Sequence, residues 1–228
     1  MGQRVASRRL AGDERREQIL REATRCFATR GYRGTTTREL AARAGVAEAV
    51  IYRHFPSKEA LYQAVIEHQM GPVELPERLA PLARSRDDRR LFRELAGEIL
   101  ARLDGDPALL RILLYTALEG HALSEPFFRT RVRRVREFVT EYIRDRIAEG
   151  AFRPVDPVLA ARAFLGMVFD HAHVRCIYGQ TEAYPQGLDE VADAFVDIFL
   201  GGLRRPGSAE DLREAGAPLR RGSEERPS

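Results

Sequence analysis

The sequence predicts an all-α protein with a small N-terminal helical domain and a larger C-terminal helical domain. Apolar residues recur at helical spacing along most of the 228 residues, and no segment alternates with the two-residue period of a strand. The composition agrees, because 44% hydrophobic and 31% charged residues are typical of a globular protein that buries a core. No apolar run approaches the roughly 20 residues that cross a bilayer, and the N-terminus lacks the apolar core of a signal peptide.

Positive charge is concentrated in the first quarter of the chain. Residues 1–60 hold 13 basic and 7 acidic residues, a net charge of +6, within a whole-chain charge of +3. This asymmetry favours a polyanionic partner for the N-terminal part, although a solvated basic face has the same composition. The two cysteines, Cys26 and Cys176, lie far apart, which favours isolated thiols in a reducing cytoplasm over a disulfide.

We expect a flexible basic arm over residues 1–12 and a first domain over residues 13–70. The first helix of this domain is predicted from Asp13, because acidic side chains in the first turn suit the helix macrodipole. Its apolar residues form one stripe, and Gly31 ends it.

Three short helices are predicted to complete the first domain. Thr36 and Glu39 match a capping box, in which both side chains satisfy free backbone amides, and Gly45 ends the second helix. A third helix is expected over about residues 47–54, and a fourth over about residues 57–70.

A larger helical domain is expected over residues 71–205, followed by a disordered tail over 206–228 that is rich in Gly, Ser, Pro and charge. Its first stretch, 71–87, is broken by prolines. Gly, Asp and Pro residues then separate the longer helices. These are predicted at about 88–103, 107–119, 125–149, 156–178 and 188–204.

The predicted helix that follows Thr36 and the predicted helix at about 47–54 are joined by the turn ARAGVAE. Together they match a helix-turn-helix. In that motif the second helix enters the major groove of DNA. The threonines at 35–37 place hydroxyl and amide groups at a helix start, where phosphates bind. Tyr52, His54 and Lys58 offer further hydrogen-bond donors to phosphates at the far side of the helix predicted at about 47–54.

The motifs GYRGTTTRELAARAGV and IYRHFPSKEALY, with the IL and A..CF spacing before them, resemble the DNA-binding domain of the TetR/AcrR family of bacterial transcriptional regulators. The resemblance covers residues 13–62. It implies a homodimer on double-stranded operator DNA, with C-terminal helices that bind a small-molecule effector. It implies that four residues contact phosphates, namely Thr37, Tyr52, His54 and Lys58. It also implies that positions 47–49 and 53 lie near bases. The expected DNA-binding residues are Thr36, Thr37, Arg38, Ala47, Glu48, Ala49, Tyr52, Arg53, His54 and Lys58.

The third helix departs from the family pattern at Ala47, where serine or threonine is often found. Alanine cannot cap the helix, which costs about 0.5–2 kcal/mol of local stability. Glu48 beside it either accepts a hydrogen bond from a cytosine or favours the helix N-terminus electrostatically. Ile51 and Phe55 are expected to pack in the core.

Many aromatic residues in the second domain are compatible with a bundle that encloses an apolar ligand pocket. Packing in the core is the alternative for each of them. The candidates that combine rings with polar groups in the central helices are Tyr115, His121, Phe138, Tyr142, Met167, Asp170 and His171.

The sequence DHAHVRC at 170–176 does not predict a metal site, because the two histidines point to nearly opposite sides of one helix. No metal or other cofactor is expected.

Helix 188–204 has a broad apolar face and is expected to pair with 156–178 in a dimer interface, with packing inside the chain as the alternative. The run RTRVRRVREF at 129–138 is a cationic helix face. It is either solvated surface, a contact for an acidic ligand, or an acidic dimer contact.

We therefore expect a ligand-responsive transcriptional regulator, a repressor that a small molecule releases from a near-palindromic operator. A DNA-binding regulator without small-molecule control is the alternative, and activation is a second one. The chain has no nucleophile elbow, phosphate-binding glycine loop or HExxH motif, so neither an enzyme nor catalytic residues are expected.

Overall fold

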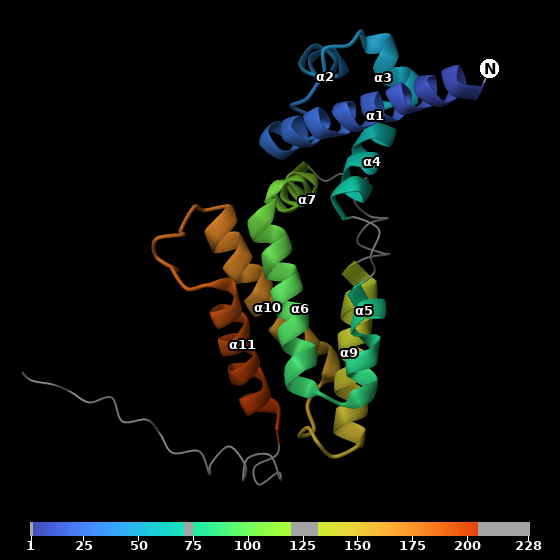
Figure 1. Cartoon of the computed structure of the whole chain (residues 1–228). Coiled ribbons are helices and arrows are strands. Elements are labelled where there is room, and N and C mark those ends of the chain that lie inside the picture. The colour runs from blue at the N-terminus through green and yellow to red at the C-terminus, as the bar shows by residue number, and fades with distance from the viewer. Residues whose placement is uncertain (1, 71–74, 120–131, 205–228) are drawn as a thin grey trace, which may run out of the picture.

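The computed structural model describes residues 2–70, 75–119 and 132–204, and helices form the two parts of this structure (Figure 1). The N-terminal part, here called the head, lies at the top of Figure 1. It contains α1 (Gly2–Arg30), α2 (Thr37–Arg43), α3 (Glu48–His54) and α4 (Lys58–Met70). The body below contains α5 (Leu75–Ser85), α6 (Asp88–Gly105), α7 (Ala108–Glu119), α9 (Arg133–Ala148), α10 (Pro157–Cys176) and α11 (Leu188–Leu203). The predicted all-α fold is confirmed.

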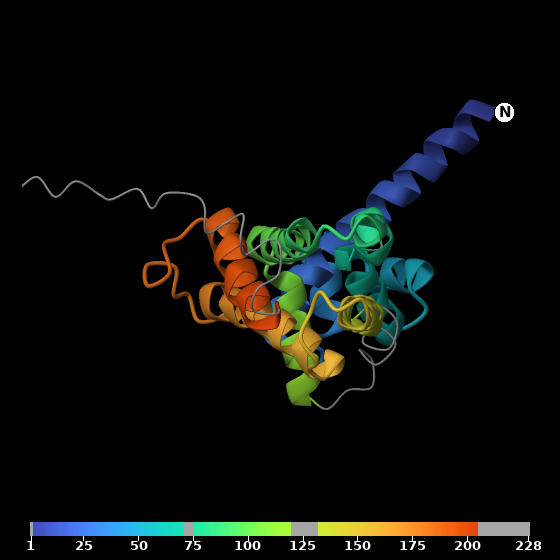
Figure 2. The same ribbon diagram turned by 90° about the horizontal axis from the view of Figure 1, so that it is seen from below.

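Helix α1 begins at Gly2, well before the expected start at Asp13, so residues 2–12 are helical where an arm was expected. Figure 2 shows this N-terminal part of α1 projecting beyond the rest of the molecule. The sequence permits it, because alanine, arginine and leucine are good helix formers and one glycine costs only about 1 kcal/mol.

A helix that the sequence did not predict, α5, occupies Leu75–Ser85 within the stretch expected to be broken. Pro76 lies in its first turn, where proline is tolerated, whereas Pro81 removes one internal hydrogen bond. Packing outweighs that loss: Leu79 is buried in the body core, with Leu82 against it. Of the helix predicted at 125–149, residues 133–148 are observed as α9, and 120–131 lie outside the described residues, as does the tail from 205.

The helix boundaries predicted in the head follow the local signals. The Thr36 side chain accepts a hydrogen bond from the Glu39 N–H, and Gly45 has a positive φ of 62° after α2. The second half of the expected capping box differs, because the Glu39 carboxylate forms ion pairs with Arg30 and Arg43.

Two large apolar clusters form the cores of the body and the head, and a small third cluster contains Leu103, Leu110 and Ala172. The body cluster surrounds Phe92, whose ring centroid lies 4.8 Å from that of Phe164 and 5.0 Å from that of Phe199. The head cluster includes Leu109 and Ile112 of α7 among its buried members. The head therefore folds against a helix of the body.

Both cysteines are free thiols, Cys26 buried and Cys176 half-buried. Burial raises the pKa of each thiol, which keeps the reactive thiolate scarce at neutral pH. Within the described residues, no helix is long and apolar enough to cross a membrane.

Candidate DNA-binding surface and ligand cavity

Helices α2 and α3 pack through their inner faces and leave one side of α3 open. Ile51 is 1% exposed and Phe55 is 3% exposed, which confirms that both belong to the core. On the outer side, Ala47, Ala49 and Arg53 are exposed. The burial pattern therefore separates the packing face of α3 from a face that is free to meet a partner.

A chain of hydrogen bonds joins the start of α2 to α3. The Tyr52 hydroxyl donates to Thr37 Oγ1 at 3.2 Å, and the Thr37 hydroxyl donates to the Glu48 carboxylate. Ala47 occupies the N-cap position of α3 without a side-chain hydrogen bond. Glu48 thus has a structural partner within the head, and the three polar side chains lie side by side at its outer surface.

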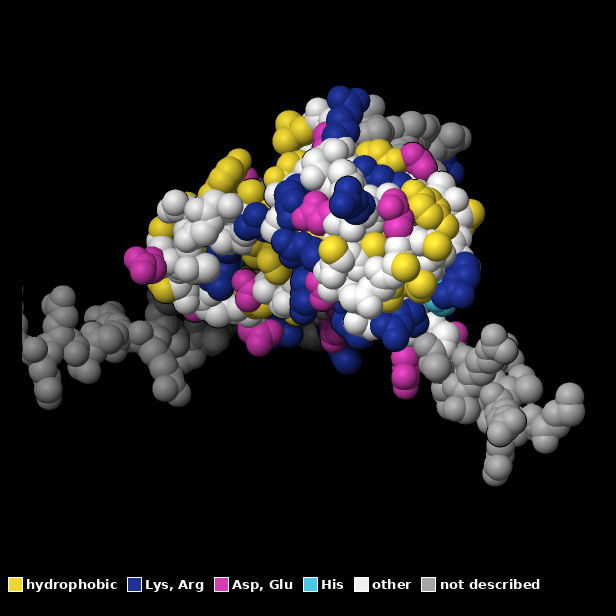
Figure 3. All heavy atoms as spheres, turned by 90° about the horizontal axis from the view of Figure 1, so that it is seen from above, with side chains coloured by type: hydrophobic (Ala, Val, Ile, Leu, Met, Phe, Trp, Pro, Cys, Tyr) yellow, Lys and Arg dark blue, Asp and Glu magenta, His cyan; other side chains and the backbone are white. Residues whose placement is uncertain are grey.

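Two arginines on this surface lack an acidic partner within the part of the chain that the structure describes. Arg38 on α2 and Arg53 on α3 are both exposed. Figure 3 shows lysine and arginine side chains on the upper face of the molecule, with acidic groups between them. Unpaired guanidinium groups on adjacent short helices suit contact with phosphates and base edges.

Two of the polar residues singled out in the sequence serve the head itself. Thr35 is fully buried and its hydroxyl donates to the Gly31 carbonyl at 2.9 Å. Lys58 is half-buried, with its Nζ 4.1 Å from the centre of the Tyr32 ring. Burial also lowers the pKa of Lys58. Lys58 therefore points toward an aromatic ring in this structure. His54 is half-buried at the end of α3, and Thr36 is exposed at the start of α2.

Helix α7 docks on the head through polar groups as well as the apolar cluster. The hydroxyl of the fully buried Tyr62 contacts the Ile112 carbonyl at 3.2 Å and the Thr116 hydroxyl. The Tyr115 hydroxyl donates to the Thr29 carbonyl at 2.8 Å. These hydrogen bonds fix the height and rotation of α7 against α1 and α4.

The last residue of α7 clasps the turn between α1 and α2. The Glu119 carboxylate accepts hydrogen bonds from the N–H groups of Tyr32 and Arg33, each at 3.1 Å. Gly31, with φ 70°, makes room for it: a Cβ there would lie 2.4 Å from Glu119 Oε1 and 2.8 Å from a ring carbon of Tyr115. Only glycine fits both this backbone conformation and the close approach of α7.

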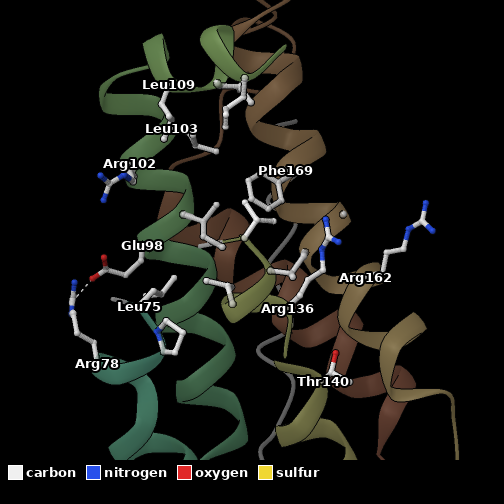
Figure 4. A pocket seen from close by; sticks show the side chains of 18 of the residues that line it. Leu75, Arg78, Glu98, Arg102, Leu103, Leu109, Arg136, Thr140, Arg162 and Phe169 are labelled. Atoms are coloured by element: carbon white, nitrogen blue, oxygen red, sulfur yellow. Dashed lines mark hydrogen bonds and ion pairs between the residues drawn. The ribbon is translucent and has the colours of Figure 1, made fainter. Parts of the chain in front are cut away.

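A cavity of about 700 Å³ lies in the body directly beneath α7 (Figure 4). Helices α5, α6, α7, α9 and α10 all contribute to it. Most of its lining is apolar, and its charged residues are four arginines and one glutamate. The apolar side chains nearest α7 are Leu103, Leu109, Leu110, Leu113, Leu165 and Phe169, and the charged ones are Arg78, Glu98, Arg102, Arg136 and Arg162. Its volume and composition are typical of a small-molecule site.

The ligand-binding residues expected from the sequence do not line this cavity. Tyr115 is bonded to the head, Phe138 packs against the body core, and the buried Tyr142 donates to Asp88. Met167, Asp170 and His171 instead line a second cavity of about 500 Å³ between α10 and α11. His121 lies outside the described residues. Tyr115 and Tyr142 are engaged by other parts of the fold, and three candidates on α10 line a separate cavity, so a ligand-binding role for these residues stays a prediction.

Sequence reasoning missed the residues that do line the larger cavity. Most are leucines and valines with no distinctive signal, brought together from five helices. One signal existed in RTRVRRVREF: Arg133 pairs with Glu137 and Arg134 with Glu77, whereas Arg136 faces the cavity. The described arginines of this run, from position 133 on, therefore divide into two paired surface residues and one cavity residue.

An exposed helix-turn-helix surface in a basic head, docked on a helical body with a cavity, defines a DNA-binding regulator. The chain belongs to the tetR family: residues 19–65 match the profile described as bacterial regulatory proteins, tetR family. Residues 104–202 match that of the AefR-like transcriptional repressor C-terminal domain. It is therefore a TetR-family DNA-binding transcriptional regulator. Both profiles describe regulators, and the family binds operator DNA and acts as dimers.

The chain resembles individual members of the family over most of its length. It is 34% identical over 166 residues to the nucleoid occlusion factor SlmA of Vibrio campbellii, covering 68% of this chain and 80% of that one. The solved structure of NalD, the secondary repressor of the MexAB-OprM multidrug efflux pump in Pseudomonas aeruginosa, matches with a TM-score of 0.65 and 22% identity. That match covers 86% of this chain and 98% of NalD.

A third relative was solved with bound partners. AibR, in complex with isovaleryl coenzyme A and operator DNA, matches with a TM-score of 0.57 and 27% identity. The match covers 81% of this chain and 97% of AibR.

Proposed function

We propose that this regulator is a homodimeric repressor that leaves a near-palindromic operator when a small molecule fills the larger cavity. The observation that carries the proposal is the position of α7. Leu109, Leu110 and Leu113 line the cavity, while Tyr115 and Glu119 of the same helix hold the head. The AibR structure, which holds both isovaleryl coenzyme A and operator DNA, supports the same pairing of sites.

The proposed DNA contacts divide into two groups. Arg53, with Ala47 and Ala49 beside it, lies on the exposed face of α3 and reads bases in the major groove. Thr37 and Tyr52 contact phosphates from the outer surface that they already share through a hydrogen bond. Arg38 and Thr36 extend the phosphate contacts, and His54 with Lys58 borders the far side.

A ligand acts on DNA through α7 only if it binds one arrangement of that helix more tightly than another. The position of the cavity supports such a preference, because a ligand in it contacts three leucines of α7. The opposite face of α7 carries the hydrogen bonds to Thr29, Tyr32 and Arg33. Displacement of α7 therefore moves the head relative to the body.

The proposed dimer face lies on α10 and α11. Leu159 and Ile198 are 61% and 66% exposed, and Ala163 and Ala194 are exposed beside them on the same helices. Residues 159, 163, 167, 170 and 174 of α10 share one face at helical spacing. The rest of the apolar face predicted on α11 is used inside the chain, where Val191, Phe199 and Leu203 are buried.

The proposal is tested by the affinity of the purified full-length protein for its own upstream DNA, measured by fluorescence anisotropy. We expect it to prefer this DNA to random duplex, and the dissociation constant to rise roughly a hundredfold or more between about 50 and about 200 mM salt. Equal affinity for both DNAs at moderate salt contradicts the proposal.

Single substitutions test which residues contact DNA. Arg53→Gln should weaken operator binding about tenfold to a hundredfold and relax the sequence preference, because it loses a base contact. Thr37→Val should weaken specific and random DNA equally. Arg144→Gln, an exposed arginine of α9 in the body, is the matched control and should change neither. If no small molecule that binds the protein alters its DNA affinity, the chain is a regulator without ligand control.

A further inference from the structure

The charges that line the larger cavity do not balance. Four arginines and one glutamate give 4 − 1 = +3 around a largely apolar interior. A cavity with low-dielectric walls and charge of one sign concentrates ions of the opposite sign. An anionic ligand would offset this excess of positive charge, whereas a neutral or cationic ligand would not.

The arginines on the α5–α6 side of the cavity are already engaged. Arg78 pairs with Glu98, and Figure 4 shows this ion pair at one side of the cavity. Arg102 donates to the Gln69 carbonyl. Because the guanidinium groups of Arg78 and Arg102 already have partners, they are less available to a ligand than the arginines on the opposite side of the cavity.

Arg136 and Arg162, on the α9–α10 side, have no acidic partner among the residues that the structure describes. Figure 4 draws both on the same side, with the Arg136 side chain rising along the cavity and the Arg162 guanidinium farther out. Thr140, four residues after Arg136, shares its face of α9. It is only 9% exposed, and its hydroxyl bonds to no other described residue.

The end of the cavity next to α7 is lined by apolar side chains and therefore suits an apolar chain. Leu109, Leu110 and Leu113 line it from above, and Leu165 and Phe169 line it from α10. Figure 4 places Phe169 between the leucines near α7 and the Arg136 side chain. The cavity therefore has an apolar end against α7 and a cationic side with a hydroxyl group.

We propose that the larger cavity binds an amphipathic anion, an unbranched or short-branched acyl chain with an anionic head. The chain packs under α7, and the head binds the Arg136 guanidinium and the Thr140 hydroxyl, with Arg162 adding positive charge at the entrance. A guanidinium and a hydroxyl on one helix face supply the charge and the hydrogen-bond donors that a carboxylate or a phosphate accepts. The shared chemistry covers a free fatty acid and an acyl-coenzyme A, whose phosphates would reach the entrance.

The inference is tested without DNA, by calorimetric titration of the full-length protein at neutral pH with three probes of equal chain length. Decanoate, decanol and decyltrimethylammonium share a ten-carbon chain and carry an anionic, a neutral and a cationic head. We expect decanoate to bind at least about tenfold tighter than decanol, the worth of a charge-assisted hydrogen bond, and the cation more weakly still. Equal binding of decanol and decanoate overturns the anionic head.

Chain length and source are tested with the same protein. From octanoate to decanoate, each added methylene should tighten binding about fourfold. Decanoyl-coenzyme A beside decanoate distinguishes the two sources, and tighter binding of either one over decanol supports the inference. Failure of both to bind overturns it.

The variant Arg136→Gln should weaken decanoate about tenfold or more and leave decanol unchanged. Arg144→Gln removes the same charge from an exposed position on the same helix and should change neither. Equal effects of the two variants overturn the assignment of Arg136. The comparison of probes on the unaltered protein holds even if a variant folds poorly.

The inference rests on the proposed function only for its effect on DNA, and the two can fail separately. If decanoate binds with the expected charge preference but operator affinity stays constant, the ligand class stands and the release mechanism fails. If the operator is bound specifically but no anionic chain binds, the DNA-binding function stands and the ligand class fails.

Discussion

At the scale of single residues, the N-cap of α3 is the weak point of the head. Ala47 has the extended backbone of an N-cap, with φ −72° and ψ 147°, but no side-chain hydrogen bond. The neighbouring helix α2 has the hydroxyl that α3 lacks, at Thr36. The difference between these caps is a property of one side chain and could be predicted from the sequence.

Ala47→Ser should stabilise the protein by about 0.5–2 kcal/mol, because serine satisfies a free amide of the first turn. The free energy of unfolding in urea measures the effect. Ala49→Ser, exposed within α3, is the control and should be neutral or destabilising by a few tenths of a kcal/mol. A gain no larger than that of the control would show that another group already caps the helix.

A buried ion pair in the body is more costly to break than the surface pairs. The Asp88 carboxylate accepts hydrogen bonds from Arg146 Nε at 2.8 Å and from a terminal nitrogen at 2.9 Å, and from the Tyr142 hydroxyl. The side chains of Asp88 and Arg146 are 6% and 14% exposed. Burial, together with the hydrogen bond to Asp88, raises the pKa of Tyr142.

Asp88→Asn should destabilise the protein by about 1–3 kcal/mol, because the largely buried Arg146 guanidinium loses its buried partner and keeps only the more exposed Glu149, at 2.7 Å. Asp145→Asn tests an exposed pair instead: Asp145 lies 3.6 Å from Arg86 and is 59% exposed. Its loss should cost less than about 1 kcal/mol. Similar melting temperatures for the two variants would contradict the difference in burial.

At the scale of elements, α7 is the helix whose two faces have different tasks. Leu109, Leu110 and Leu113 line the cavity, and the polar residues of the same helix hold α1, α4 and the turn after α1. The sequence predicted this helix at about the right position, but its polar tips could not be assigned. Tyr115 was expected in a pocket because a ring with a hydroxyl suits both a ligand and a neighbouring helix.

Glu119→Ala should expose the N–H groups of Tyr32 and Arg33, because their acceptor is lost. Hydrogen exchange at these two amides should accelerate, and a cavity ligand should change operator affinity by a smaller factor than in the unaltered protein. Glu67→Ala, at an exposed position of α4, is the control. Unchanged exchange at both amides would mean that α7 does not hold the turn in solution.

At the scale of the whole molecule, dimerisation decides whether two heads can read one operator. Ile198 is 66% exposed on α11, and Ala194, one turn before it on the same face, is exposed as well. Exposed apolar residues gathered on one face mark interaction surfaces.

Ile198→Glu should convert the dimer to a monomer at micromolar concentration and weaken operator binding more than tenfold, because charge is buried in the interface. Sedimentation or light scattering measures the mass. Leu118→Glu introduces the same change at a position on α7 that is 84% exposed and should leave the mass unchanged. A dimer that survives Ile198→Glu would place the interface elsewhere.

Local signals in the sequence determined the elements of this protein and its family. Helix starts and stops depend on side chains within a few residues, so Thr36, Gly31 and Gly45 could be interpreted directly. The recognition motifs are also local. The sequence prediction started α1 too late, because the helix propensity of residues 2–12 was underweighted, and it missed α5, because prolines were weighted above packing of Leu79 in the body core.

Tertiary structure alone decided which side chains meet across the chain. The cavity depends on five helices from α5 to α10. The hydrogen bonds of Glu119 join it to Tyr32 and Arg33, which lie 87 and 86 positions away in the sequence. The arginines of 129–138 look alike in the sequence, yet only the fold pairs Arg134 with Glu77 and turns Arg136 toward the cavity. Contacts at this range depend on how whole helices pack, because periodicity determines which face of a helix is apolar but not what that face will touch.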